Sequence, residues 1–224
     1  MSCHRPVVAA IFDMDGLLID SEPLWQQAEM DILSTLDVDL SRREELPETL
    51  GLRIDQVVRM WYEVLPWRGP TRQEVTLRVI HRALDLVEET RPLLPGVEHA
   101  LQLCQRSGLK IGLASASPMF MLERVLEMFN LREYFETLAS AEHLDYSKPH
   151  PQVYLDAAAR LGADPLNCVT LEDSFNGMIA TKAARMRSIV VPDVNYATDP
   201  RWALADVKLA SLSELTAQHL LGRG

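Results

Sequence analysis

Two aspartates one residue apart, Asp13 and Asp15, offer the first chemistry that the sequence contains. They follow an apolar run over residues 7–12, and Gly16 comes directly after them. An apolar run of this length that stops at polar residues and a glycine is typical of a buried strand. Two carboxylates where such a strand ends could hold a cation or exchange protons at a ligand site. An ordinary turn is the alternative, because Asp and Gly are both common turn residues.

Two later apolar runs end in the same manner. One stops at Ser115 and Ala116, and the other stops at Glu172 and Asp173. The carboxyl ends of parallel strands share one edge of a sheet, and open α/β sheets bind their ligands at that edge. The sequence therefore predicts that these residues meet the two N-terminal aspartates at a single site.

Several carboxylates crowded together repel one another unless a cation neutralises them. Ligand sets made only of oxygen suit a hard metal, above all Mg²⁺. We expect Asp13 and Asp173 to bind it directly, together with the backbone carbonyl of Asp15, and Glu172 to act through a water molecule. Mn²⁺ or Co²⁺ is expected to substitute in vitro.

The order of helical and strand-like segments predicts an α/β fold with a Rossmann-like parallel sheet. From residue 95 onward, strands alternate with helices. Between residues 23 and 89, by contrast, the apolar spacing is helical throughout, in three stretches. We predict an α/β core formed by residues 1–20 and 91–224, and an inserted all-helical cap formed by residues 21–90.

Composition limits the classes of partner. The chain has 224 residues and a net charge of −10, from 32 acidic and 22 basic residues, which argues against nucleic acid or anionic membranes as partners. Its three cysteines, Cys3, Cys104 and Cys168, form no C-x-x-C pair, and such an odd count suits a reducing compartment. Without a long apolar segment at the N-terminus or elsewhere, the protein is expected to be cytoplasmic.

The set of motifs resembles the haloacid dehalogenase superfamily of phosphotransferases. The resemblance rests on D-x-D-G at residues 13–16, the strand-ending Ser115, Lys148 before a proline, and E-D at residues 172–173. It covers nearly the whole chain, in the right order. The second aspartate of D-x-D is missing in dehalogenases proper, so Asp15 favours phosphate over halide as the group transferred.

The position of the helical insert narrows the resemblance. An insert directly after D-x-D-G-x-L resembles the subgroup with a helical C1 cap, which includes β-phosphoglucomutase and small sugar-phosphate phosphatases. Residues 12–22, 49–53 and 146–150 look most like those of bacterial 2-deoxyglucose-6-phosphate (hexitol phosphate) phosphatases.

The resemblance implies a role for each motif. Asp13 is the expected nucleophile, which forms an aspartyl-phosphate, and Asp15 is the expected general acid and base. Ser115, the backbone N–H of Ala116 and the ammonium of Lys148 are expected to hold the phosphoryl oxygens. The predicted substrate-binding residues are Asp13, Met14, Asp15, Ser115, Ala116, Lys148, Arg53 and Glu22.

In the predicted cap, Trp25 and Trp61 lie on apolar helical patterns and are first of all core candidates. Arg53 follows Gly51 and Leu52 at the start of a helix, a place suited to an anionic or hydroxyl-rich ligand. We expect Arg53 and Glu22 to face the active site when the cap closes.

Together these expectations describe a monomeric, magnesium-dependent hydrolase of small sugar or polyol phosphates. A sugar phosphomutase of the β-phosphoglucomutase type is the alternative, because it would use the same residues. A non-catalytic protein that binds phosphorylated metabolites is a third possibility, which the intact set of catalytic residues disfavours.

Overall fold

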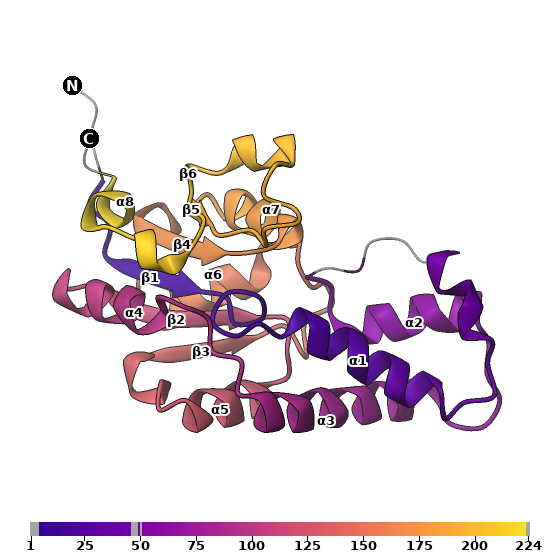
Figure 1. Ribbon diagram of the computed structural model, residues 1–224. Coiled ribbons are helices and arrows are strands. Elements are labelled where there is room, and N and C mark those ends of the chain that lie inside the picture. Colours follow the sequence, from indigo (N-terminus) through magenta and orange to yellow (C-terminus); the bar gives the residue numbers. More distant parts are fainter. Residues whose placement is uncertain (1–4, 46–48, 50, 223–224) are drawn as a thin grey trace.

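A six-stranded parallel sheet forms the centre of the molecule (Figure 1). The computed structural model describes residues 5–45, 49 and 51–222. Its strand order is β3-β2-β1-β4-β5-β6. The strands are β1 (Ala9–Phe12), β2 (Lys110–Ser115), β3 (Thr137–Ser140), β4 (Cys168–Glu172), β5 (Arg187–Val190) and β6 (Val207–Lys208). The predicted fold class is confirmed.

Helices cover both faces of this sheet. The α-helices are α1 (Glu22–Leu33), α2 (Ile54–Val64), α3 (Arg72–Thr90), α4 (Val97–Arg106), α5 (Met119–Met128), α6 (Gln152–Arg160), α7 (Phe175–Ala183) and α8 (Ala217–Leu221). Helices α4 and α5 pack on one face, and α6 and α7 pack on the other. Among the described residues, no helix combines the length and apolar character that crossing a bilayer requires.

Strand β1 contributes to the packing on both faces. Ala10 and Phe12 belong to the apolar cluster beneath α4 and α5, whereas Ala9 and Ile11 belong to the cluster beneath α6. All four side chains are fully buried. A strand covered on both faces needs apolar residues at every position, which explains the continuous apolar run before Asp13.

Helices α1, α2 and α3 lie together beyond the carboxyl ends of the strands (Figure 1). Both α1 and α2 pack against α3, and α3 also contacts α5. Thr71 caps α3, because its hydroxyl accepts the N–H of Glu74 while the Glu74 carboxylate accepts the N–H of Thr71. The buried apolar residues of these three helices join the cluster of α4 and α5. The division into a core and a cap at residues 20–21 and 90–91 stays a prediction.

Element boundaries differ from the predicted ones by one to three residues, as is usual for helix and strand ends. The first strand, for example, begins at Ala9, two residues after the start of the apolar run at residue 7. Cys104 and Cys168 are buried and free, as expected for small core residues, while Cys3 lies outside the described residues.

The connections of the sheet place a crevice beside β1. From β1 the chain proceeds to β2 and β3 on one side, and later returns to β4 on the other side. Phe12 lies level with Leu113 of β2 and with Leu171 of β4. The strand order thus reverses at β1, and a reversal of this kind leaves a ligand-binding crevice at the carboxyl edge.

Truncation of a core side chain tests this packing. Leu101 of α4 is fully buried, so Leu101→Ala should lower the free energy of unfolding in urea by about 2–5 kcal/mol. Leu77 of α3 is 52% exposed, so Leu77→Ala should change it by no more than about 0.5 kcal/mol. Equal effects of the two substitutions would contradict the described packing of α4.

Candidate active site

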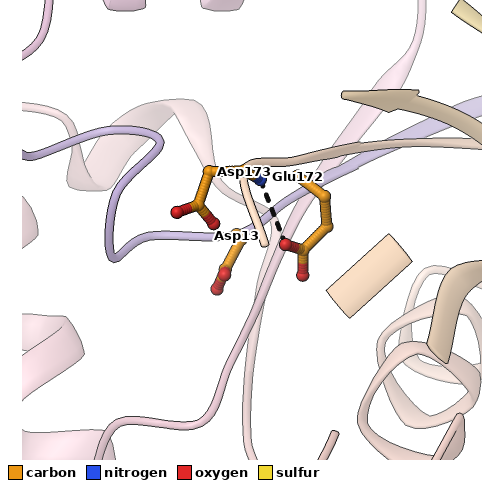
Figure 2. A group of neighbouring side chains, drawn as sticks. All are labelled: Asp13, Glu172 and Asp173. Atoms are coloured by element: carbon orange, nitrogen blue, oxygen red, sulfur yellow. Dashed lines mark hydrogen bonds between the residues drawn. The ribbon is translucent and has the colours of Figure 1, made fainter. Parts of the chain in front are cut away.

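Three carboxylates from two neighbouring strands converge at the crevice. Asp13 follows β1, whereas Glu172 ends β4 and Asp173 follows it. One carboxylate oxygen from each residue lies within 4.8 Å of those of the other two, and all three residues are buried (Figure 2). The Asp13 N–H donates to the Leu171 carbonyl at 3.0 Å, which extends the ladder between β1 and β4 as far as the site.

Gly16 allows the loop after β1 to pass against Asp173. Its φ is +71°, in the left-handed region that glycine adopts without steric cost. A Cβ atom at this position would lie 2.0 Å from Oδ2 of Asp173. The glycine of the D-x-D-G motif is therefore required by backbone conformation and by the closeness of a catalytic-site carboxylate.

Lys148 bridges the two strand ends. Its Nζ lies 2.8 Å from Oδ2 of Asp13 and 2.7 Å from Oε1 of Glu172, and the side chain is 1% exposed. Tyr154 of α6 donates its hydroxyl to the same oxygen of Glu172, and its ring lies beside Lys148. The buried ammonium is thus held in one position, pointing at Asp13.

Glu172 serves mainly to position its neighbours. Its Oε1 accepts from Lys148 and Tyr154, and its Oε2 accepts from the backbone N–H groups of Asp173 and Ser174 at 3.1 and 3.2 Å. Figure 2 shows this carboxylate turned back toward the Asp173 backbone. The expected water-mediated contact of Glu172 with a metal stays a prediction.

The site contains more buried negative than positive charge, and this excess shifts the pKa values of its side chains. Burial, assisted by the charge of Glu172 and opposed by Lys148, raises the pKa of Asp13 to about 8. Burial and the charges of Glu172 and Asp13 likewise raise the pKa of Asp173 well above its ordinary value. For Lys148, burial alone would lower the pKa, but the carboxylates of Asp13 and Glu172 outweigh it and raise the pKa.

The arrangement fits a divalent cation. Oδ1 of Asp13 and Oδ1 of Asp173 are both buried and accept no hydrogen bond from any described residue. Buried polar atoms are normally paired, so two neighbouring unpaired carboxylate oxygens indicate a ligand. Three carboxylates meet here with one ammonium, and oxygen donors of this kind suit Mg²⁺. Asp13 and Asp173 would hold the ion.

Asp15 is held by donors on two sides. Its Oδ1 accepts from the Ser21 hydroxyl at 2.7 Å and from Nε1 of Trp25 at 2.9 Å. Its Oδ2 accepts from the Ser117 hydroxyl at 2.7 Å and, more weakly, from the Ser115 hydroxyl at 3.4 Å. The carboxylate is therefore fixed between the start of α1 and the loop after β2.

Three of these residues, Trp25, Ser117 and Tyr154, were not among the predicted site residues. Trp25 was expected first of all in the core; it packs against the core cluster but also lines the pocket and donates to Asp15, so that expectation was incomplete. Trp61, expected in the core, is 2% exposed. Trp25 could not be recognised as a site residue, because a tryptophan at helical apolar spacing resembles a core residue. Ser117 could have been predicted, because it lies only two residues after Ser115 at the end of the same strand.

A pocket opens between these residues and the first two helices. The residues that line it are Asp13, Asp15, Glu22, Trp25, Gln26, Glu29, Thr49, Gly51, Leu52, Arg53, Ile54, Val57, Ser115, Ala116, Ser117, Lys148 and Asp173. Every predicted site residue lines it except Met14 and Glu172, and both of these are fully buried. The Met14 side chain belongs to the apolar cluster, so only its backbone could contact a phosphoryl group.

Arg53 lines the pocket, but its guanidinium binds protein groups. Its Nη1 donates to the carbonyls of Ala141 and Leu144 at 2.6 and 2.7 Å, and its Nε lies 2.6 Å from Asp55. These contacts tie the start of α2 to the loop after β3. A direct contact between Arg53 and a substrate stays a prediction.

Substitution of Gly16 tests how closely the loop packs against Asp173, an expected metal ligand. Gly16→Ala and the matched variant Gly108→Ala both place a side chain at φ near +70°, at a backbone cost of about 1 kcal/mol each. Only the first displaces Asp173, because no atom lies within 4 Å of a Cβ at Gly108. We expect Gly16→Ala to weaken Mg²⁺ binding at least about tenfold in calorimetric titration, and Gly108→Ala to leave it unchanged. Equal Mg²⁺ affinities in the two variants would contradict the role given to Gly16.

Comparison with known proteins agrees with this geometry. Hexitol phosphatase B of Escherichia coli strain K12 is 69% identical over 222 residues, which span 99% of this chain and 100% of that protein. CbbY from Rhodobacter sphaeroides, solved as a mutant in complex with xylulose-(1,5)bisphosphate, superposes with a TM-score of 0.84 at 26% identity, covering 96% of this chain and 99% of that one.

A β-phosphoglucomutase from Clostridium difficile shares the fold, with a TM-score of 0.79 at 24% identity, covering 95% of each chain. The sequence model of the haloacid dehalogenase-like hydrolases matches residues 10–191, which include every strand end of the site from Asp13 to Asp173. The chain belongs to the haloacid dehalogenase-like hydrolase family.

Proposed function

We propose that this protein is a magnesium-dependent phosphomonoesterase that acts on small sugar or polyol phosphates. The observation that carries the proposal is the convergence of Asp13, Asp15, Lys148 and Asp173 on one pocket beside the first two helices. The 69% identity to hexitol phosphatase B supports hexitol phosphates, the phosphate esters of six-carbon polyols, as the substrate class.

Asp13 is positioned to attack phosphorus. Its buried carboxylate lines the pocket with Nζ of Lys148 at 2.8 Å, so the charge on the transferring phosphoryl group meets a buried ammonium. Attack by a carboxylate oxygen breaks the bond to the leaving oxygen and forms an aspartyl-phosphate, which divides one difficult displacement into two steps. The metal, when bound by Asp13 and Asp173, supplies further charge neutralisation at the phosphoryl oxygens.

Asp15 is placed to transfer the proton. The Trp25 indole can only donate a hydrogen bond, so Oδ1 of Asp15 must remain an acceptor. A proton on this residue is therefore carried by Oδ2, which faces Ser115 and Ser117, whose hydroxyls can turn to accept it. From Oδ2 the proton passes to the leaving sugar oxygen. Water then attacks phosphorus, and the bond from phosphorus to the Asp13 carboxylate breaks, while the ionised Asp15 carboxylate takes the proton from that water.

Oligomeric state and location belong to the same proposal. We propose a monomer, because all the residues assigned to the site come from one chain. Reduced, buried Cys104 and Cys168 support a cytoplasmic location. Mn²⁺ and Co²⁺ are proposed as substitutes for Mg²⁺ in vitro, since oxygen ligands accept several divalent metals.

Replacement of the nucleophile tests the reaction directly. Asp13→Asn should lower kcat for magnesium-dependent phosphate release from sorbitol 6-phosphate by about 10⁴-fold or more, because the amide cannot form the aspartyl-phosphate. The far-UV circular dichroism spectrum should be unchanged. Asp37 is exposed and lies outside the pocket, so Asp37→Asn should retain normal turnover. Normal turnover by Asp13→Asn would refute the nucleophile assignment.

A second assay separates hydrolase from mutase. We expect incubation with β-glucose 1-phosphate, Mg²⁺ and a trace of glucose 1,6-bisphosphate to release inorganic phosphate without accumulation of glucose 6-phosphate. Phosphate release is followed colorimetrically, and glucose 6-phosphate by a coupled dehydrogenase. Glucose 6-phosphate formed in excess over phosphate would support the mutase instead.

A further inference from the structure

The part of the pocket that lies beyond the phosphoryl position, where the leaving group must sit, is rich in carboxylates. Glu22 and Glu29, both on α1, line the pocket together with Gln26. Glu29 is 9% exposed and accepts the Nε1 hydrogen of Trp61 at 2.8 Å, which fixes its side chain. A polyol can donate its hydroxyl hydrogens to such carboxylates, so this part of the pocket suits a hydroxyl-rich group.

The cations that line the pocket are already bound to protein groups. Among the described lining residues these cations are Lys148 and Arg53. Lys148 lies between Asp13 and Glu172, on the phosphoryl side. The guanidinium of Arg53 faces Asp55 through Nε and Nη2, at 2.6 and 3.0 Å, and its Nη1 is shared by two backbone carbonyls. The carboxylates would therefore repel a second anionic group on a substrate. Both cations among the described lining residues already bind protein groups and would not neutralise it.

Glu22 lies in surroundings of low polarity, and it lines the pocket together with the further carboxylates Asp15 and Glu29. Burial, followed by the charges of Asp15 and Glu29, raises the pKa of Glu22 to about 8. The same low polarity and the same negative neighbours would act on any anion that a substrate brings to this position. A neutral hydroxyl group escapes this penalty, and an ammonium group gains from the field.

We propose that Glu22 and Glu29 select the leaving group by its charge. The pocket accepts neutral polyols and cationic amino polyols, and it rejects leaving groups that carry a carboxylate or a second phosphate. The inference rests on the proposed phosphomonoesterase activity and deepens it by naming the substrate class. It also explains why a bisphosphate intermediate would not be retained, which separates this site from that of a mutase.

The backbone alone does not impose this selection. CbbY, which has the same fold, was solved in complex with a bisphosphate. A scaffold of this kind can therefore accommodate two phosphates, so in this chain the exclusion must come from the lining side chains. Among the described residues that line the pocket, Glu22 and Glu29 are the carboxylates outside the proposed catalytic set of Asp13, Asp15 and Asp173.

Three substrates of equal length isolate the effect of charge. Sorbitol 6-phosphate, 6-phosphogluconate and 1-amino-1-deoxysorbitol 6-phosphate carry an alcohol, a carboxylate and an ammonium group at carbon 1. With Mg²⁺ at pH 8.8, above the raised pKa of Glu22 so that this side chain is ionised, we expect kcat/KM for the carboxylate to be roughly 30- to 100-fold below that for the alcohol. For the ammonium compound, kcat/KM should equal or exceed the value for the alcohol.

Two isosteric variants identify the residues responsible. Glu22→Gln or Glu29→Gln should reduce the ratio of kcat/KM for alcohol over carboxylate at least about threefold, because each removes one charge and keeps the side-chain volume. The ratio is taken within each variant, so a general loss of activity cancels. Glu63 is exposed on α2 and pairs with Arg59, so Glu63→Gln provides the matched control and should leave the ratio unchanged.

Several outcomes would overturn the inference. One is hydrolysis of 6-phosphogluconate within threefold of sorbitol 6-phosphate by the unmodified protein. Another is equal rejection of the ammonium and carboxylate compounds, which would indicate shape and not charge. A third is an unchanged ratio in both glutamine variants. Absence of magnesium-dependent turnover with all three compounds and with p-nitrophenyl phosphate is a separate result, which would overturn the proposed function itself and the inference with it.

Discussion

The confinement of negative charge at the junction of β1 and β4 is the constraint on which the rest of the site depends. Asp13 and Asp173 emerge from adjacent parallel strands, so the sheet itself brings them together and hides them from water. Burial and mutual repulsion disfavour their ionised forms, as the raised pKa values show. Only a fixed cation can make such a pair stable as carboxylates. Lys148 is a cation that the chain provides, and the two unpaired oxygens would suit a divalent metal as a second one.

The position of Lys148 depends in turn on groups that never touch a substrate. Glu172 holds the ammonium with one oxygen and the backbone of the following loop with the other, while Tyr154 donates to the first. Removal of any one member would leave a buried charge or polar group without its partner, which costs more than the bond itself contributes. The two carboxylates at the end of β4 thus differ in their contacts: that of Glu172 holds its neighbours, whereas that of Asp173 lines the pocket with one oxygen unpaired among the described residues.

The sequence allowed the scaffold to be predicted because its signals are local. Apolar runs ending at Asp13, Ser115 and Glu172 indicate strand ends, and parallel topology then places those ends at one edge. Trp25 and Tyr154 were missed because their hydrogen bonds to Asp15 and Glu172 depend on how helices dock on the sheet, while their spacing within each helix matches that of a core residue.

The contacts of Arg53 likewise could not be predicted from the sequence. Its place at a helix start suggested contact with an anionic or hydroxyl-rich ligand, which stays a prediction, while its guanidinium also donates to carbonyls 88 and 91 residues away in the chain. No spacing rule encodes such a contact. The D-x-D-G motif was readable because the glycine, the turn and both aspartates lie within four residues, although the reason for the glycine, its closeness to Asp173, lies 157 residues away in the sequence and became visible only in three dimensions.

Asp15 joins the two halves of the pocket, and this connection bears on how specificity and chemistry are linked. Ser21 and Trp25, which hold its Oδ1, come from the start of the helix that also carries Glu22 and Glu29. Ser115, which ends β2, and Ser117, in the loop that follows, donate to its Oδ2 and line the pocket. A leaving group that displaced α1 would therefore also withdraw two hydrogen-bond donors from Asp15, the residue proposed as its general acid. The position of the bound leaving group and the orientation of the proposed acid therefore depend on the same helix. A substrate that binds in the wrong position is then expected to show a lower kcat as well as weaker binding.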